Sequence, residues 1–376
     1  MIIFVNFAPL KFGGGAERWM LDVASTVSTA EETALVDVHA SVSNTYGKFV
    51  LKRSYDSRID LNLNLKRQEH ISLTFKSFIP FTQQWKKVRK MFISARTIYM
   101  RYELLETLLI FYFGGGSAIK KSTAGIHSPF LYAITLSPLG YLHNLLYGSF
   151  LSRWVLSKMH KVHVLNPIDY ELFTKKYGLQ NIVLIPNFIS IPDASSLKKK
   201  ETDKEKLVIA FVGELSMRKG VDLLIKVVRK SPENFIFHIV GDGPLRDDVE
   251  KLLAFPNVTY HGYVDKDKVQ EIFAESDVLF VPSRAESFSL ACLEAMLYGL
   301  PIISSTDTRI GLPSFVQKIS KSGRSREYVE MLQDMGEEKR TGKLHEHQEK
   351  IQAYTKDNFS RKKIMQRLLH EVYAVN

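Results

Sequence analysis

Two glutamates stand eight positions apart in the stretch RAESFSLACLEAMLYGLPIIS, residues 284–304. Glu286 follows the apolar run DVLFVP, which is typical of a strand, and Glu294 lies in a segment typical of a helix. If residues 286–294 are mostly helical, eight steps of about 1.5 Å place the carboxylates roughly 12 Å apart on nearly one face. The pair would then be two hydroxyl-binding carboxylates held at a fixed separation.

Between the glutamates, the backbone amides of Ser287, Phe288 and Ser289 would open the helix, and a helix N-terminus favours an anion. The separation of the two carboxylates, with an anion site between them, therefore matches the distance from a sugar across a diphosphate to a ribose. The alternative is that Glu286 only complements the helix dipole and that Glu294 is a surface residue.

Other loops that follow strands add basic and glycine residues. The segment GELSMRKG (213–220) places Arg218 and Lys219 after the strand LVIAFVG, and VGDGP supplies a tight turn. HGYV (261–264) places Tyr263 in a position to contact a base. Because the carboxyl ends of parallel strands meet at one edge of a sheet, we expect these loops to converge there.

The elements that position these loops alternate between strand and helix along the whole chain. The second half is typical of a parallel sheet covered on both faces, and the first half has the same pattern in less regular form. The polar segment 190–206 separates them. We therefore predict an α/β protein with two Rossmann-like doubly wound parallel-sheet domains. The predicted boundaries are 1–189, a linker at 190–206, 207–355, and a C-terminal helix at 356–376 that returns to the first domain.

Composition and charge restrict the class of protein. The single cysteine, Cys292, excludes an intrachain disulfide and a cysteine-cluster metal site. The apolar start MIIFVNFAPL lacks a basic region and a cleavage site, so we interpret it as a buried strand and expect a cytoplasmic protein. Residues 1–186 hold 22 Lys+Arg against 12 Asp+Glu, so they carry most of the net charge of +11. This asymmetry suggests an anionic partner for the first half, although a merely solubilising charge is the alternative.

The motifs FGGGAERW, AGIHSP, VLIPN, FVGELSMRKGVDLLI, HIVGDGPL, YHGYV and the E-x7-E segment, in this order, resemble glycosyltransferase family 4. That family, also called glycosyl transferases group 1, is retaining and has the GT-B fold, in which two domains face each other across a cleft. The resemblance implies transfer of a sugar from a nucleoside-diphosphate sugar to an acceptor. It implies no cofactor and no metal, and the chain shows no Asp-x-Asp at a strand end suited to magnesium.

The resemblance also implies roles for individual residues. Catalytic roles would belong to His127, Glu286 and Lys219. Donor binding would involve Gly14, Gly15, Arg218, Lys219, Tyr263, Glu286, Ser287, Phe288, Ser289, Leu290 and Glu294. Two positions depart from the family pattern: Glu214, where arginine is frequent, and Phe188, where glycine is common. A carboxylate at 214 would repel a diphosphate unless it points away and Arg218 substitutes.

The first domain would bind the acceptor, and two of its segments suggest a lipid-linked glycan or a surface polysaccharide precursor. In residues 76–96, Phe81, Trp85, Val88 and Phe92 share one helical face beside several lysines and arginines, as in a helix that lies on anionic lipid. The alternative is that this face packs on the sheet. Residues 122–152 carry no charged side chain and offer a second apolar surface, although they are a poor transmembrane helix. We expect peripheral contact with the inner face of a membrane.

Other functions remain open at this stage. A nucleotide-sugar epimerase of the GT-B fold would release sugar or nucleotide without an acceptor, and an inactive subunit would bind nucleotide without turnover. A dehydrogenase is disfavoured because GGGAE lacks the G-x-G-x-x-G spacing. No motif supports nucleic-acid binding.

Overall fold

The computed structural model describes residues 1–6, 15–39, 68–74, 79–131, 138–192, 200, 203–308 and 310–374. The chain forms two compact units. The first comprises Met1–Leu131, Ser137–Ile185 and Met365–Asn376, and the second contains Pro186–Ile364. The chain therefore passes into the second unit after Ile185 and back into the first within its last helices.

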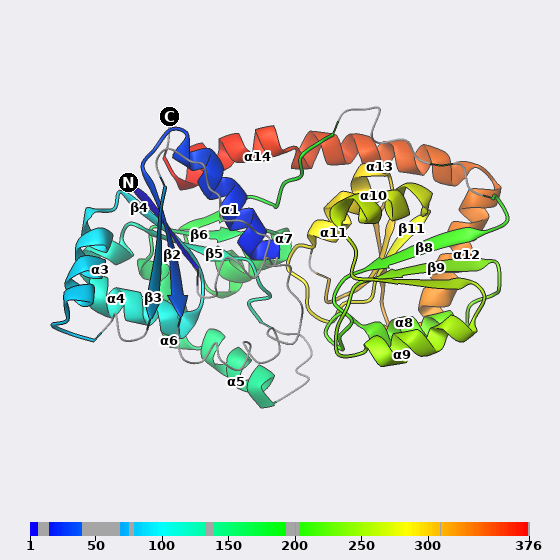
Figure 1. Cartoon of the computed structure of the whole chain (residues 1–376), viewed down its shortest axis with the longest axis horizontal. Helices are drawn as coiled ribbons and strands as arrows, with labels where there is room; N and C mark the ends of the chain where they lie inside the picture. The colour runs from blue at the N-terminus through cyan, green and yellow to red at the C-terminus, as the bar shows by residue number, and fades with distance from the viewer. Residues whose placement is uncertain are drawn as a thin grey trace. The chain divides into compact units, whose positions relative to one another are not determined.

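The first unit is built on a seven-stranded sheet in the order β3-β2-β1-β4-β5-β6-β7, with every pair parallel. Its strands are β1 (Ile2–Asn6), β2 (Thr33–His39), β3 (Gln68–Thr74), β4 (Thr97–Arg101), β5 (Ser122–Ile126), β6 (Lys161–Val164) and β7 (Ile182–Leu184). Its helices are α1 (Gly15–Ser28), α3 (Gln83–Ser94), α4 (Leu104–Ile119), α5 (Pro138–Tyr147), α6 (Phe150–Lys158) and α7 (Pro167–Glu171), followed by the π-helical turn Leu172–Lys176. Helix α1 lies on one side of this sheet and α3 and α4 on the other (Figure 1).

Helix α3 shows how the apolar stripe of the first half is used. Val88 and Phe92 expose only 3% and 0% of their surface and belong to the core of the first unit, and Trp85 packs against that core. Phe81 is 86% exposed and precedes the helix, whose first turn is capped by the Thr82 hydroxyl. Val88 and Phe92 therefore pack in the protein core, as the alternative interpretation of this stripe expects, and are not available to a membrane.

The second unit has a six-stranded sheet in the order β10-β9-β8-β11-β12-β13, again with every pair parallel. Its strands are β8 (Leu207–Val212), β9 (Phe235–Val240), β10 (Val258–Gly262), β11 (Val278–Val281), β12 (Ile302–Ser305) and β13 (Gln317–Ser320). Its helices are α8 (Val221–Val228), α9 (Arg246–Glu250) with the 3₁₀ turn Lys251–Ala254, α10 (Lys266–Glu275), α11 (Leu290–Leu297), α12 (Ser325–Arg340) and α13 (Lys343–Phe359). Helices α8 and α9 lie on one side of the sheet and α10 and α11 on the other (Figure 1).

After α13 the chain continues through α14 (Arg361–Arg367) into the π-helical turn Leu368–Val372. This last turn packs within the first unit, where the Arg96 guanidinium donates to the Tyr373 carbonyl at 3.2 Å. The expectation of two doubly wound parallel sheets is confirmed. Within the part of the chain described, no helix has both the length and the apolar character that a membrane crossing requires.

Candidate functional site

The strand-end loops of the second unit are packed tightly against one another. Gly220, with φ of 72°, ends the loop after β8, and a Cβ there would clash with the Pro282 carbonyl at the end of β11. Arg284 ties the same two loops by donating to the Met217 carbonyl at 2.6 Å and to both carboxylate oxygens of Asp222 at 2.6 and 2.8 Å. Burial alone would raise the pKa of Asp222, but the Arg284 guanidinium lowers it below its usual value.

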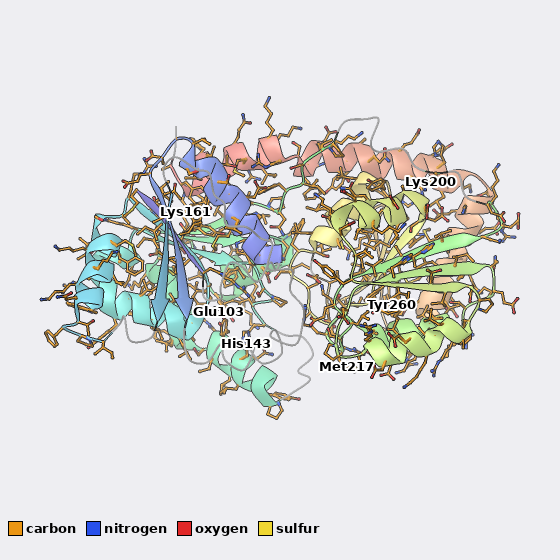
Figure 2. The ribbon with its side chains drawn as sticks, viewed as in Figure 1. Glu103, His143, Lys161, Lys200, Met217 and Tyr260 are labelled. Carbon is orange, nitrogen blue, oxygen red and sulfur yellow. The ribbon has the colours of Figure 1, made fainter. Side chains whose placement is uncertain are left out.

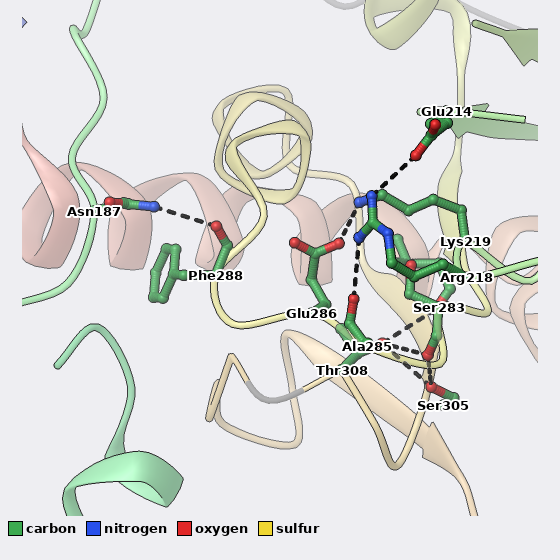
Figure 3. A network of polar contacts seen from close by, with 11 residues as sticks. Asn187, Glu214, Arg218, Lys219, Ser283, Ala285, Glu286, Phe288, Ser305 and Thr308 are labelled. Carbon is green, nitrogen blue, oxygen red and sulfur yellow. Dashed lines mark hydrogen bonds and ion pairs between the residues drawn. The ribbon is translucent and has the colours of Figure 1, made fainter. Parts of the chain in front are cut away.

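Lys219 and Glu286 meet across these two loops. The Lys219 ammonium donates to a Glu286 carboxylate oxygen (Figure 3), and the two side chains expose only 18% and 13% of their surface. Glu286 is itself fixed by a parallel bridge to Thr308 and by its N–H, which donates to the Asp307 carbonyl at 3.3 Å. The fold therefore holds one cation and one carboxylate, mostly shielded from water, at the carboxyl edge of the sheet.

Arg218 lies beside this pair in more exposed surroundings. Its guanidinium donates to Glu214 at 3.1 Å and to the Ala285 carbonyl at 3.3 Å, and 43% of its side chain is exposed (Figure 3). The unusual carboxylate of Glu214 is thus partly neutralised by Arg218 four residues later. The other departure, Phe188, is a buried residue with the Arg361 guanidinium 5.9 Å from its ring centre.

The helix that carries Glu294 begins later than predicted. Helix α11 starts at Leu290 with Ser289 as its cap, so a helix from Ser287 is wrong. Residues 286–289 are drawn away from helical geometry by the bridge of Glu286 to Thr308 and by the Phe288 carbonyl, which accepts from Asn187 at 3.2 Å. The uniform helical spacing of roughly 12 Å between the glutamates therefore does not hold. The amides that open the helix begin at Leu290, and the Ser289 side chain does not cap them.

The remaining predicted residues of this unit lie on the same loops and helix. Glu294 is partly buried. Burial, with the Glu294 charge as the second cause, raises the pKa of Tyr298, the C-cap of α11. Tyr263 follows β10 and is 72% exposed. Burial, with the nearby Glu286 charge as the second cause, raises the pKa of Cys292 to about 12, so this thiol stays protonated and is no nucleophile.

In the first unit His127 follows β5 and belongs to a chain of hydrogen bonds that crosses the sheet. Its Nε2 lies 2.8 Å from the Tyr99 hydroxyl, which lies 2.7 Å from Nδ1 of His163. His163 Nε2 is 2.7 Å from the Ile185 carbonyl. The Trp19 ring packs on His127 with centroids 4.4 Å apart. Gly14 lies outside the described residues, and Gly15 is the first residue of α1.

The Ile185 carbonyl determines which atom carries each proton in this series of hydrogen bonds, because a carbonyl oxygen can only accept. His163 must donate through Nε2, so its Nδ1 accepts from the Tyr99 hydroxyl. The Tyr99 oxygen then accepts from Nε2–H of His127, which leaves His127 Nδ1 with a lone pair. Burial raises the pKa of Tyr99 well above its usual value, so the hydroxyl keeps its proton. The sequence motif AGIHSP indicated His127, but Tyr99 and His163 were missed because they reach it from other strands.

Acid should destabilise the protein through these imidazoles. Burial lowers the pKa of His163 to about 4, and burial, with His163 and Arg101 as further causes, lowers the pKa of His127. In the unfolded chain both titrate near 6.5. The folded state therefore binds fewer protons below pH 6.5, and the free energy of unfolding falls as the pH drops from 6.5 toward 4. Each imidazole contributes about 1.4 kcal/mol per pH unit.

Urea unfolding of the wild type at pH 7.5, 6.5 and 5.5 measures this slope. His163→Gln should flatten it, whereas His345→Gln, which removes an exposed histidine paired with Glu349, should not. An unfolding free energy that stays constant or rises below pH 6.5 would contradict the assignment of two neutral imidazoles.

Comparison with known proteins adds to this geometry. Residues 193–318 match the family described as glycosyl transferases group 1. An uncharacterised 41.2 kDa protein in the cps region of Klebsiella pneumoniae is 37% identical over 131 residues, 33% of this chain and 36% of that protein. Sulfoquinovosyl transferase SQD2 of Arabidopsis thaliana is 36% identical over 103 residues, 27% of this chain and 20% of that protein. The chain thus matches well under half of the length of these curated relatives.

The match to solved structures extends over both units. Anabaena HepE, solved in complex with UDP and glucose, superposes with a TM-score of 0.72 over 100% of both chains at 18% identity. At that identity the likeness shows the fold. The chain therefore has the GT-B fold of glycosyltransferases, and its residues 193–318 match glycosyl transferases group 1.

Proposed function

We propose that the protein is a retaining, metal-independent glycosyltransferase of the family 4 type that moves a sugar from a nucleoside-diphosphate sugar to an acceptor. The observation that carries the proposal is the shielded pair Lys219–Glu286, which lies within the segment that matches glycosyl transferases group 1. The HepE structure, which binds UDP and glucose in the same fold, supports the class of donor.

The pair supplies both interactions that such a donor requires. A Lys ammonium has three donors, so Lys219 can hold Glu286 and a diphosphate oxygen together. Glu286 then accepts from hydroxyls of the donor sugar, and Glu294 accepts from the ribose hydroxyls. The leaving diphosphate gains charge as the glycosidic bond breaks. A fixed cation and the amides that open α11 therefore stabilise the transition state more than the bound substrate.

His127 contributes through its free ring nitrogen. Burial keeps the imidazole neutral. The hydrogen bonds through Tyr99 and His163 leave Nδ1 as an acceptor for a hydroxyl of the bound sugar. With retention of configuration and no nucleophile, the acceptor's proton passes to the donor phosphate. We assign Gly14, Gly15, Arg218 and Tyr263 to donor binding as well.

The acceptor in this proposal is a lipid-linked glycan or a surface polysaccharide precursor, and the protein works at the inner face of the membrane. Support comes from the net charge of +10 in residues 1–186 and from the names of two relatives, one from a cps region and one a sulfoquinovosyl transferase. An epimerase or an inactive binding subunit remains the alternative.

A panel of nucleotide-sugars tests the proposal by thermal shift and by release of nucleoside diphosphate. One donor should stabilise the wild type, and Glu294→Ala should weaken its binding about 10- to 100-fold, because a hydrogen bond to a charged group contributes about 1.5–3 kcal/mol. Glu271→Ala, at an exposed glutamate of α10 that pairs with Lys268, is the matched control. Stabilisation by no nucleotide-sugar would refute the proposal, and donor turnover that ignores every acceptor would favour the epimerase.

A further inference from the structure

Helices α5 and α6 expose large apolar side chains on their outer faces. On α5, Tyr141, Leu142 and Leu145 are 67%, 50% and 71% exposed. On α6, Phe150, Leu151 and Trp154 are 79%, 45% and 42% exposed. Each set has the spacing i, i+1, i+4, which covers an arc of about 100° on one face of a helix. We call these six residues the α5–α6 surface.

The opposite faces of both helices hold them to the first unit. On α5, His143 contacts the Phe130 carbonyl at 3.1 Å and stacks on Tyr147, whose hydroxyl donates to Glu103 at 2.6 Å (Figure 2 labels His143 and Glu103). On α6, the buried residues are Ser152, Val155 and Leu156. The outward faces of these two helices thus carry large apolar side chains at positions where a surface helix usually has polar ones. The two helices also contact each other.

The segment that carries this surface has charges of one sign. No aspartate or glutamate occurs from Thr107 to Ile168, a segment that contains five lysines and arginines. Lys158 is exposed and follows Trp154 by one turn, so it lies on the outer face of α6. Arg153 is instead engaged with the Tyr177 ring, 4.4 Å from its centre.

We propose that the α5–α6 surface docks on an anionic lipid bilayer. Apolar side chains with Trp and Tyr among them, on helices that carry lysine but no aspartate or glutamate, suit the boundary between acyl chains and anionic headgroups. A protein partner or a second copy of this chain would not require the absence of acidic residues. The proposed function includes contact with a membrane, and the α5–α6 surface is where we place that contact. The docking itself does not require sugar transfer.

Sedimentation with vesicles at low salt tests the docking. The wild type should bind vesicles of phosphatidylglycerol and phosphatidylcholine, and bind phosphatidylcholine alone much less. The triple variant Leu145→Ser, Phe150→Ser, Trp154→Ser should lose at least about 100-fold in binding, because each replaced side chain contributes upward of 1 kcal/mol. Lys158→Gln should lose about 5-fold, since one lysine near such a surface contributes about 1 kcal/mol.

The control Phe81→Ser, Ile93→Ser removes exposed apolar residues near and on α3, 86% and 44% exposed, and should bind as the wild type does. All the replaced residues are exposed, so each variant should keep its unfolding temperature and its stabilisation by nucleotide-sugar. Failure of the wild type to bind anionic vesicles would overturn the proposal. Binding by the triple variant equal to that of the wild type would also overturn it. So would a triple variant that loses only its self-association and still binds vesicles. Vesicle binding without any nucleotide-sugar binding would instead leave the docking intact and refute the transferase.

Discussion

Lys219→Ala is expected to lower kcat for sugar transfer about 100- to 1,000-fold, while KM for the donor changes much less. Removal of one preorganised group that stabilises developing charge typically has this effect. The shielding of Lys219, 18% exposed, reduces the water that would otherwise compensate for its loss. Steady-state release of nucleoside diphosphate at saturating acceptor measures both constants.

The matched control is Lys251→Ala. Lys251 also donates to a carboxylate, that of Asp248 at 2.7 Å, but its side chain is 65% exposed in the 3₁₀ turn that follows α9. This control should keep full activity. Lys219→Ala also leaves Glu286 mostly buried without its cation, so Lys219→Ala, Glu286→Gln should recover stability without recovering kcat. If Lys219→Ala raised only KM, Lys219 would bind the ground state alone and the proposed role would fail.

The second sheet could be predicted because its strands are buried on both faces. The segment LVIAFV is a continuous apolar run, FIFHIV is interrupted only by His238, and they form β8 and β9. Strand β13 was missed, because QKIS is short and three of its four residues are polar. The start of α11 was predicted three residues early, because the bridge of Glu286 to Thr308 is a contact distant in sequence that no local pattern indicates.

Contacts between residues distant in sequence also limited what could be predicted of the site. Lys219 and Glu286 are 67 residues apart, and only the strand-end rule brings their loops to one edge. Their ion pair, and the bond of Glu214 to Arg218, depend on side-chain geometry that the sequence does not specify. Tyr99 and His163 lie 64 residues apart inside apolar strand patterns, where a tyrosine and a histidine are indistinguishable from ordinary core residues.

Tyr99→Phe is expected to lower the free energy of unfolding by about 2–6 kcal/mol. The phenylalanine ring keeps the packing on Trp19, Phe4 and Tyr373, so only the hydroxyl is lost. That oxygen is the partner of both His127 and His163, and each buried nitrogen left without a partner costs about 1–3 kcal/mol. Urea unfolding at pH 7.5 measures the change.

Tyr102→Phe provides a matched control in the same unit. Tyr102 is also buried, and its hydroxyl forms one hydrogen bond, 3.0 Å from Ser152 Oγ, so this change should cost about 1 kcal/mol. A loss for Tyr99→Phe no greater than that of Tyr102→Phe would contradict the double role of the Tyr99 hydroxyl. Gly125 provides a further check, because a Cβ there would clash with Tyr99 Oη and His127 Nε2. Gly125→Ala should therefore disrupt the hydrogen bonds between Tyr99, His127 and His163.

The effect of Tyr99→Phe on activity distinguishes a role in positioning His127 from a role in stability alone. Without the Tyr99 hydroxyl, the Nε2–H of His127 loses the acceptor that fixes its tautomer, so Nδ1 is no longer held as the acceptor. Tyr99→Phe should therefore lower kcat for sugar transfer about 10-fold or more at a temperature where the variant is folded. Its affinity for free nucleoside diphosphate should not change, because neither Tyr99 nor His127 is among the groups assigned to bind the diphosphate. Tyr102→Phe should keep kcat, and equal kcat values for the two variants would show that Tyr99 only stabilises the fold.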